Sequence, residues 1–237
     1  MTLESKYLEI QSKIEQACAK SGRSPEDVLL VGVTKTHPPE TVEEALKLGI
    51  LHIGENKVQE ALAKKTIVGE RGIWHMIGHL QSNKVKNAVS IFDRIDSVDS
   101  LALAEEISKR CETLGKTMTV LLEVNVSGEG TKYGVKPDQA QDLAQKVNDL
   151  PGLQLQGFMT MAPVMEDVRG TRPYFAKLRE LRDRIQQATG FHLPDLSMGM
   201  SQDFEIAIEE GSTLIRLGTI LFGSRPKPKK EFFEDSL

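Results

Sequence analysis

The sequence predicts an α/β protein built as a single (β/α)8 barrel of the TIM type, with one extra helix at its N-terminal end. Three observations lead to this fold class. Short apolar runs alternate with helical patterns, which is typical of parallel strands joined by right-handed crossovers. There are eight such runs in 237 residues, a length at which strand–helix units commonly close into one barrel. No G-x-G-x-x-G motif follows the first run, which disfavours an open dinucleotide-binding sheet.

The first element is a helix predicted over residues 2–21, outside the strand–helix repeat. Its apolar residues recur every three or four positions, which places them on one helix face. They are Leu3, Tyr7, Ile10, Ile14 and Cys18. Gly22 follows where a helix C-terminus is expected. We therefore treat residues 1–22 as an N-terminal helix added to the barrel.

The eight predicted strands are apolar, partly β-branched runs bounded by turn signals. They cover residues 28–34, 51–54, 73–77, 93–97, 117–126, 153–159, 194–197 and 213–217. Segments between them, such as "PETVEEALKLG" and "SLALAEEISKRCETLG", have helix formers, acidic starts and glycine or basic ends. We expect one domain over residues 1–237, in which 225–237 is an irregular tail.

The composition is that of a globular protein with a sizeable core. Hydrophobic residues make up 39% and charged residues 27% of the chain, and the net charge is -4. No overall positive field exists to attract nucleic acid or anionic lipid. The cysteines, Cys18 and Cys111, lack disulfide or metal-type spacing, and no apolar run reaches the roughly 18 residues of a membrane span. We expect a cytoplasmic protein that binds neither nucleic acid nor membranes.

Two basic residues fall at the ends of the repeat. Lys35 ends the first strand in "LLVGVTKTHPPE", and Arg216 lies in the eighth strand in "STLIRLGTILFG". Barrel closure makes these strands neighbours at about 4.8 Å. Side-chain alternation puts Arg216 and Leu214 on one face of the strand. Because active sites of such barrels lie at the carboxyl ends of the strands, we expect Lys35 and Arg216 to share one site.

The loops after the seventh and eighth strands have the chemistry of a phosphate site. Barrels often bind phosphate there, where backbone N–H groups at helix starts are unpaired. "LSMGMSQDFEIAIEEG" and the Gly218–Thr219 turn supply small residues, hydroxyls and glycine. A primary amine, a phosphate cradle and a guanidinium together match the aldehyde, phosphate and ring nitrogen of pyridoxal 5'-phosphate.

Each of these residues, taken singly, also has an ordinary interpretation. Lys35 could be a solvated strand end, Arg216 an ion-pair residue of the barrel mouth, and Gly218–Thr219 a plain turn. Their joint placement favours the cofactor. His75 and His79 in "WHMIGH" lack an obvious third ligand for zinc, so no metal is predicted, and His75 is expected to line the site or to be held by hydrogen bonds.

The sequence resembles the pyridoxal phosphate homeostasis proteins, which are related in fold to the barrel of alanine racemase. The matching motifs run from the first strand to the eighth and are "VGVTKTHP", "GENKVQEA", "WHMIGHLQSNK", "VNVSGEGTKYG", "LQGFMTMAP" and "LSMGMSQDFEIAIEEGSTLIRLGTILFG". His37 departs from the proline or basic residue expected there. The resemblance implies a fold-type III cofactor site, whose residues we expect to be Lys35 (as a covalent aldimine), Asn56, His75, Met200, Ser201, Arg216, Gly218 and Thr219. In this site Ser201, Gly218 and Thr219 would hold the phosphate, and Arg216 would face the pyridine nitrogen.

The expected role is that of a carrier without an assured catalytic residue. An arginine opposite the ring nitrogen does not give up its proton, so the pyridine stays a poor electron sink. Racemases that resemble this barrel take a second base, a tyrosine, from an additional β domain, and here about twenty residues follow the eighth strand. Tyr133 lies in the loop after the fifth strand and could approach the site, but we read it first as an ordinary loop residue. We expect the protein to hold pyridoxal phosphate and regulate intracellular vitamin B6 and amino and keto acids.

Other functions remain open on the sequence alone. An amino-acid racemase would use the same cofactor, and a Schiff-base aldolase on a phosphorylated sugar would use the lysine and phosphate cradle without it. A pure interaction module leaves the convergence at the strand ends unexplained. The expected partners are the cofactor itself and pyridoxal-phosphate-dependent apoenzymes. A monomer is expected because a dimer interface of the racemases lies in their second domain.

Overall fold

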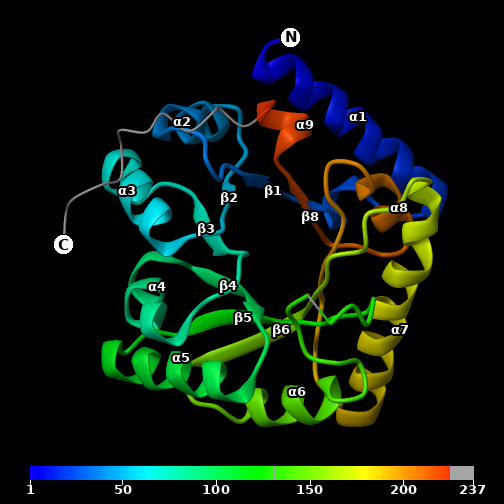
Figure 1. Ribbon diagram of the computed structural model, residues 1–237. Coiled ribbons are helices and arrows are strands. Elements are labelled where there is room, and N and C mark those ends of the chain that lie inside the picture. Colours follow the sequence, from blue (N-terminus) through cyan, green and yellow to red (C-terminus); the bar gives the residue numbers. More distant parts are fainter. Residues whose placement is uncertain (131, 225–237) are drawn as a thin grey trace.

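Eight parallel strands form a closed barrel in the computed structural model, which describes residues 1–130 and 132–224 (Figure 1). The strands follow one another around the barrel in chain order. They are β1 (Leu29–Val33), β2 (His52–Glu55), β3 (Ile73–Met76), β4 (Arg94–Val98), β5 (Met118–Glu123), β6 (Leu153–Met159), β7 (Asp195–Ser197) and β8 (Leu214–Leu217). The predicted (β/α)8 fold is confirmed; the expected tail, 225–237, lies outside the described residues.

Closure of the barrel joins the two ends of the chain. β1 pairs with β8 in parallel, with Val31 opposite Arg216 and Gly32 opposite Leu217. β1 also pairs with β2 on its other side. The carboxyl ends of β8, β1 and β2 are therefore consecutive on one rim of the barrel, and Lys35 lies beyond β1 on that rim.

Helices surround the strands on the outside (Figure 1). They are α1 (Leu3–Ser21), α2 (Pro39–Lys47), α3 (Val58–Val68), α4 (Val85–Ile91), α5 (Leu101–Leu114), α6 (Ala140–Asn148), α7 (Arg172–Thr189), α8 (Phe204–Glu209) and α9 (Thr219–Phe222). α1 packs against α8 and α9. It begins where the Thr2 hydroxyl accepts a hydrogen bond from the Ser5 N–H and ends at Gly22, which is left-handed with φ 66°.

The apolar core lies between the strands and the helices. Its largest fully buried side chains include Trp74, Phe92, Phe158 and Phe175. The core cysteines are free and buried. Among the helices of residues 1–130 and 132–224, none combines the length and apolar character that crossing a membrane requires.

The inside of the barrel, in contrast, contains ion pairs. The Arg94 guanidinium of β4 lies 2.5 Å from the Asp195 carboxylate of β7. These strands are not neighbours, so this ion pair crosses the barrel interior. Arg94 also approaches Asp96 of its own strand at 3.4 Å. Buried charges need such partners to offset their loss of hydration.

Candidate functional site

A cavity of about 710 Å³ opens at the carboxyl ends of the strands. Its walls come from the ends of β1, β2, β3, β5 and β8 and from the loops after β5, β6 and β7. The sequence-predicted site residues that line it are Lys35, Asn56, Met200, Ser201, Arg216, Gly218 and Thr219. Residues from opposite ends of the chain are thus brought together, as barrel closure requires.

Arg216 is fixed at the base of this cavity. Its guanidinium donates hydrogen bonds to the Ser197 hydroxyl at 2.7 Å and to the Thr160 carbonyl oxygen at 2.9 Å. Burial lowers the pKa of Arg216, and the carboxyl groups of Asp96, Glu123 and Asp203 oppose that effect. A guanidinium has N–H donors and no acceptor, so an arginine held in this way offers a ligand in the cavity only donors, in fixed positions.

The loops after β7 and β8 meet at one side of the cavity. The Ser201 hydroxyl accepts a hydrogen bond from the Ile220 N–H at 3.3 Å, which ties the two loops together. Asp203 shapes the first loop, since its Oδ1 accepts from the Met200 N–H at 2.6 Å. A Cβ at Gly218 would lie 3.3 Å from the Val33 carbonyl oxygen, so the absence of a side chain keeps this corner open. Small polar groups in such a corner suit an anionic ligand group.

Asn56 lines the cavity, and its position depends on the absence of a side chain at Gly78. A Cβ at position 78 would lie 2.6 Å from the Asn56 carbonyl oxygen and 2.8 Å from its Cα. Such distances are too short for any side chain, so the backbones after β2 and β3 can approach each other only with glycine here. The positions of Asn56 and Gly78 are therefore coupled.

Lys35 lies in the loop after β1, half-buried at the cavity wall. The next residue, Thr36, has φ 66°, and among the residues that the structure describes it is the sole non-glycine residue with positive φ. A β-branched residue in the left-handed region is strained and persists where surrounding contacts hold it. Contacts of the surrounding groups are therefore needed to maintain the backbone conformation next to Lys35.

His75 does not line the cavity, which corrects the expectation from the sequence. It is fully buried inside the barrel, where its Nδ1 lies 2.8 Å from Asp96 Oδ2 and its Nε2 lies 2.8 Å from His52 Nδ1. β3 ends at Met76, so the rim is reached only at residues 77–79. Burial, followed by the charge of His75, lowers the pKa of His52 to about 4. Over residues 1–130 and 132–224, no group of three or more side chains of metal-ligating type is placed to hold a metal ion.

Two aromatic rings in the cavity wall were not among the sequence-predicted site residues. Tyr133 stacks on His79, with ring centroids 3.9 Å apart and planes 11° apart, and both rings line the cavity. Tyr133 was first read as an ordinary loop residue. The loop after β5 folds back because the Val135 N–H donates to the Glu123 carbonyl oxygen at 2.8 Å. That return, in which Gly134 has a positive φ of 108°, brings Tyr133 to the rim; in the sequence only the glycine at position 134 hints at such a turn.

Glu123 places a buried carboxyl group in the cavity wall opposite Lys35, since β5 lies across the barrel from β1. Burial raises the pKa of Glu123 to about 7; Arg216 acts to lower it and Asp99 to raise it. In the unfolded chain the same group has its ordinary value of 4.5. The folded state therefore binds this proton more tightly, and stability is lost as pH rises from the unfolded value through the folded one.

Because glutamine never ionises, Glu123→Gln removes the loss of stability at high pH. We therefore expect the substitution to increase the free energy of unfolding by about 2 kcal/mol more near pH 8 than near pH 5. Urea denaturation of both proteins at the two pH values measures this difference. An equal effect of the substitution at both pH values would show that Glu123 does not titrate in this range.

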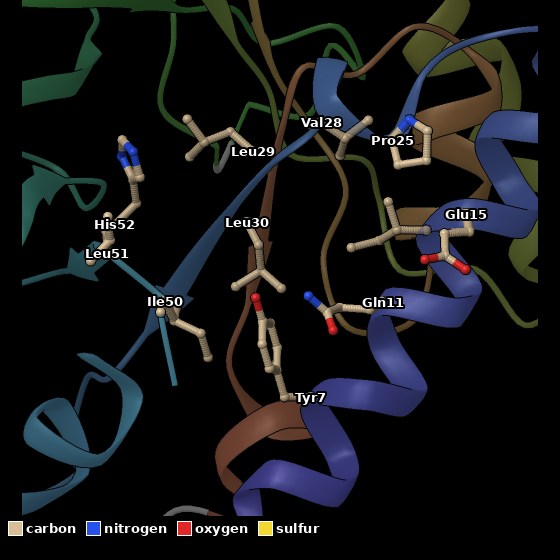
Figure 2. Close-up of a pocket in the computed structure, with 12 residues that line it drawn as sticks. Tyr7, Gln11, Glu15, Pro25, Val28, Leu29, Leu30, Ile50, Leu51 and His52 are labelled. Carbon is tan, nitrogen blue, oxygen red and sulfur yellow. The ribbon is translucent and has the colours of Figure 1, made fainter. Parts of the chain in front are cut away.

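A second, smaller hollow of about 300 Å³ lies at the opposite end of the barrel, beside the starts of β1 and β2 (Figure 2). Tyr7 and Gln11 point from α1 toward Leu30, and His52 lies on the far side. None of the sequence-predicted site residues is among its lining residues. The site at the carboxyl ends of the strands is therefore the candidate functional site.

Known proteins of similar sequence share this barrel. Residues 9–226 match the family described as alanine racemase, N-terminal domain. A pyridoxal phosphate homeostasis protein of Aquifex aeolicus (strain VF5) is 45% identical over 217 residues, which cover 91% of this chain and 95% of the relative.

Solved structures extend the comparison. The structure of PipY from Synechococcus elongatus PCC7942 with PLP bound has a TM-score of 0.83 and 35% identity, covering 94% of this chain and 100% of that one. An alanine racemase of Clostridium difficile 630 has a TM-score of 0.74 at 16% identity, covering 96% of this chain and 58% of the racemase. The likeness to the racemase shows a shared fold alone.

Proposed function

This chain belongs to the pyridoxal phosphate homeostasis proteins, a family with the alanine racemase N-terminal fold, and on that premise we propose that it binds pyridoxal 5'-phosphate through Lys35 and regulates the supply of this cofactor. One observation carries the proposal. A single cavity brings together a lysine, a corner of small polar groups and a fixed guanidinium. These groups match the aldehyde, the phosphate and the ring nitrogen of one molecule.

The residues present fit this ligand. The cavity volume of about 710 Å³ is in the range of small-molecule sites. When bound, the cofactor supplies an aldehyde that condenses reversibly with a primary amine and releases water. We propose that Lys35 provides this amine, that Ser201 and the Gly218–Thr219 turn hold the phosphate, and that Arg216 faces the ring nitrogen. Asn56 and Met200 also line the cavity and would contact the ring.

The experiment is a titration of the purified protein with pyridoxal 5'-phosphate, followed by borohydride reduction and peptide mass spectrometry. We expect a new visible absorption band at one equivalent and one phosphopyridoxyl group per chain, on the peptide that contains Lys35. Saturable phosphate-dependent binding with no covalent label would support a pocket but contradict the role given to Lys35. Absence of binding would exclude the function.

We further propose that catalysis is not the principal role. The names of the curated relatives describe homeostasis rather than a reaction. Arg216 supports this assignment, because a guanidinium facing the ring nitrogen does not supply a proton to it. Tyr133, at the rim of the cavity, is 54% exposed, and an open rim suits reversible binding and release of the cofactor.

A racemase is the second candidate, because Tyr133 lines the cavity where a second base would be needed. We expect loaded protein to racemise L-alanine or L-serine no faster than the free cofactor, followed as loss of circular dichroism. Steady-state turnover that disappears in Tyr133→Phe would instead establish an enzyme in which this phenol moves a proton. The phosphorylated-sugar aldolase is not favoured, since the relatives' names point to the cofactor.

The remaining proposals concern the setting of this function. We propose that residues 1–237 act as one domain and one copy, in the cytoplasm, and that pyridoxal-phosphate-dependent apoenzymes receive the cofactor. Free, buried Cys18 and Cys111 suit a reducing compartment. Release to an apoenzyme requires a reversible bond, which a lysine adduct provides.

Gly78→Ala is expected to weaken cofactor binding about fivefold, the effect of losing one net hydrogen bond of about 1 kcal/mol from Asn56. The added Cβ would displace Asn56, which it would otherwise approach to 2.6 Å. Spectroscopic titration measures the change. Gly130→Ala serves as the control, because a Cβ there meets nothing within 4 Å. Unchanged affinity in Gly78→Ala would show that Asn56 does not contact the cofactor.

A further inference from the structure

A buried ionic cluster lies beside the loop that carries Lys35, and the proposed function does not use it. Its centre is Lys64 of α3, which is 3% exposed. The Lys64 ammonium donates to the Thr34 carbonyl oxygen at 2.7 Å, to Glu55 Oε1 at 2.6 Å and to Glu60 Oε1 at 2.8 Å. The cluster therefore joins the ends of β1 and β2 to the helix that follows β2.

The cluster holds both peptide groups that flank Lys35. The Thr34 carbonyl, bound by Lys64, belongs to the peptide group before Lys35. The Thr36 N–H, which donates to Glu60 Oε1, belongs to the peptide group after it. The Thr34 hydroxyl adds a bond to Glu55 Oε1 at 2.6 Å. These contacts account for the strained left-handed backbone of Thr36, because such conformations persist where surrounding groups determine them.

Stability alone does not explain this arrangement. A buried ion cluster loses hydration, and apolar residues of similar volume commonly serve a fold as well. Glu55 Oε2 is buried with no hydrogen-bond partner among the described residues, which adds to the energetic penalty. Burial raises the pKa of Glu55, and Lys64 opposes that effect. What the cluster provides instead is directional contact to the backbone on either side of Lys35.

We propose that Lys64 is a positioning residue for Lys35, which it orients by holding the Thr34 carbonyl directly and the Thr36 N–H through Glu60. The inference rests on the proposed function, since it concerns the bond between Lys35 and the cofactor. Lys64 does not touch the ligand: it is absent from the cavity wall. Its effect is on how often the Lys35 amine points at the aldehyde carbon, and not on how tightly the phosphate and ring are held.

The test separates these two quantities with two ligands. Stopped-flow absorbance gives the rate of adduct formation with pyridoxal 5'-phosphate. Equilibrium dialysis gives the affinity for pyridoxamine 5'-phosphate, which has the same ring and phosphate but no aldehyde. In Lys64→Met we expect the rate to fall at least about tenfold, because misorientation of a reacting group slows reaction, while the second affinity changes less than about twofold.

Two further variants make the result specific. Lys65→Met is the matched control, because this neighbour on the same helix donates to the Ile91 carbonyl oxygen at 2.8 Å, away from Lys35, and should behave as wild type. Glu60→Ala removes the contact to Thr36 and one of the three acceptors of Lys64, while the bond from Lys64 to the Thr34 carbonyl oxygen stays; the Glu60 side chain is 17% exposed. This substitution should slow adduct formation several-fold at unchanged pyridoxamine 5'-phosphate affinity, and it decides the question if Lys64→Met does not fold.

The outcomes distinguish this inference from the proposed function. If Lys64→Met lowers the rate of adduct formation and the affinity for pyridoxamine 5'-phosphate equally, the cluster merely supports the fold. If it lowers neither, the cluster does not orient Lys35. Either result overturns the inference, while the wild-type protein still forms the adduct. Failure of wild type itself to form an adduct would overturn the proposed function and this inference with it.

Discussion

Lys35→Ala is expected to abolish the visible absorption band that the lysine adduct of pyridoxal 5'-phosphate gives, and to leave no phosphopyridoxyl label on the chain after borohydride reduction. Lys35 is the lysine that lines the cavity in the part of the chain that the structure describes. Its backbone is held by the contacts of Thr34 and Thr36. The other lysines of residues 1–130 and 132–224 do not line the cavity, and so lack equivalent access to an aldehyde placed between Ser201 and Arg216.

The variant should keep part of its affinity, because the phosphate corner and Arg216 are untouched. We expect the dissociation constant to rise at least about tenfold, the equivalent of about 1.4 kcal/mol, as the covalent contribution is lost. Lys57→Ala is the matched control, an exposed lysine one residue after Asn56, and should bind as wild type. An intact absorption band in Lys35→Ala would assign the bond to another amine.

Arg216→Met is expected to lower the free energy of unfolding by about 4 kcal/mol, in the range found when one partner of a buried charge network is removed. The substitution leaves the Ser197 hydroxyl and the Thr160 carbonyl oxygen without their guanidinium donors. It also removes the cation that faces Glu123 and Asp203. Urea denaturation near pH 8, where Glu123 is mostly ionised, should show the largest loss.

Two controls interpret that result. Arg169→Met removes an exposed arginine whose ion pair with Asp167 is 2.7 Å long, and should leave the urea midpoint close to that of wild type, because solvent screens exposed ion pairs. Ser197→Ala removes one acceptor of Arg216 and should cost about 1 kcal/mol. A loss in Arg216→Met no larger than that in Arg169→Met would show that the buried guanidinium is not needed to balance the cavity carboxyl groups.

The barrel and the meeting of Lys35 with Arg216 follow from the sequence because both rest on regular features. Strand–helix alternation gives the topology, and topology alone makes β1 and β8 neighbours. The direction of Arg216 follows from its place in the strand, since alternate side chains face the same side. Nothing beyond pattern and connectivity is required for these conclusions.

Other features depend on where elements end and on how helices pack, which patterns do not give. His75 was assigned to the rim because it was read as the end of its strand, whereas it lies within β3 and its ring pairs with Asp96 inside the barrel. The fifth strand was predicted to residue 126, but β5 ends at Glu123, where the returning loop brings Tyr133 to the cavity.

Lys64 illustrates the same limit from the helix side. In the sequence it is one of two adjacent lysines in a helical pattern, "LAKKTIV", which reads as a solvated helix face. Its burial arises only when α3 packs against the ends of β1 and β2, where the Thr34 carbonyl oxygen and the Glu55 carboxylate accept hydrogen bonds from its ammonium group. Partners distant in sequence determine this position, and no local spacing signals it.

The most direct measurement is a crystal structure of the protein with pyridoxal 5'-phosphate. We expect continuous density from the Lys35 Nζ to the ligand, with the phosphate between Ser201 and the Gly218–Thr219 turn and Arg216 opposite the ring nitrogen. A Lys35 side chain turned away from the ligand, or a phosphate bound elsewhere on the barrel, would contradict the account.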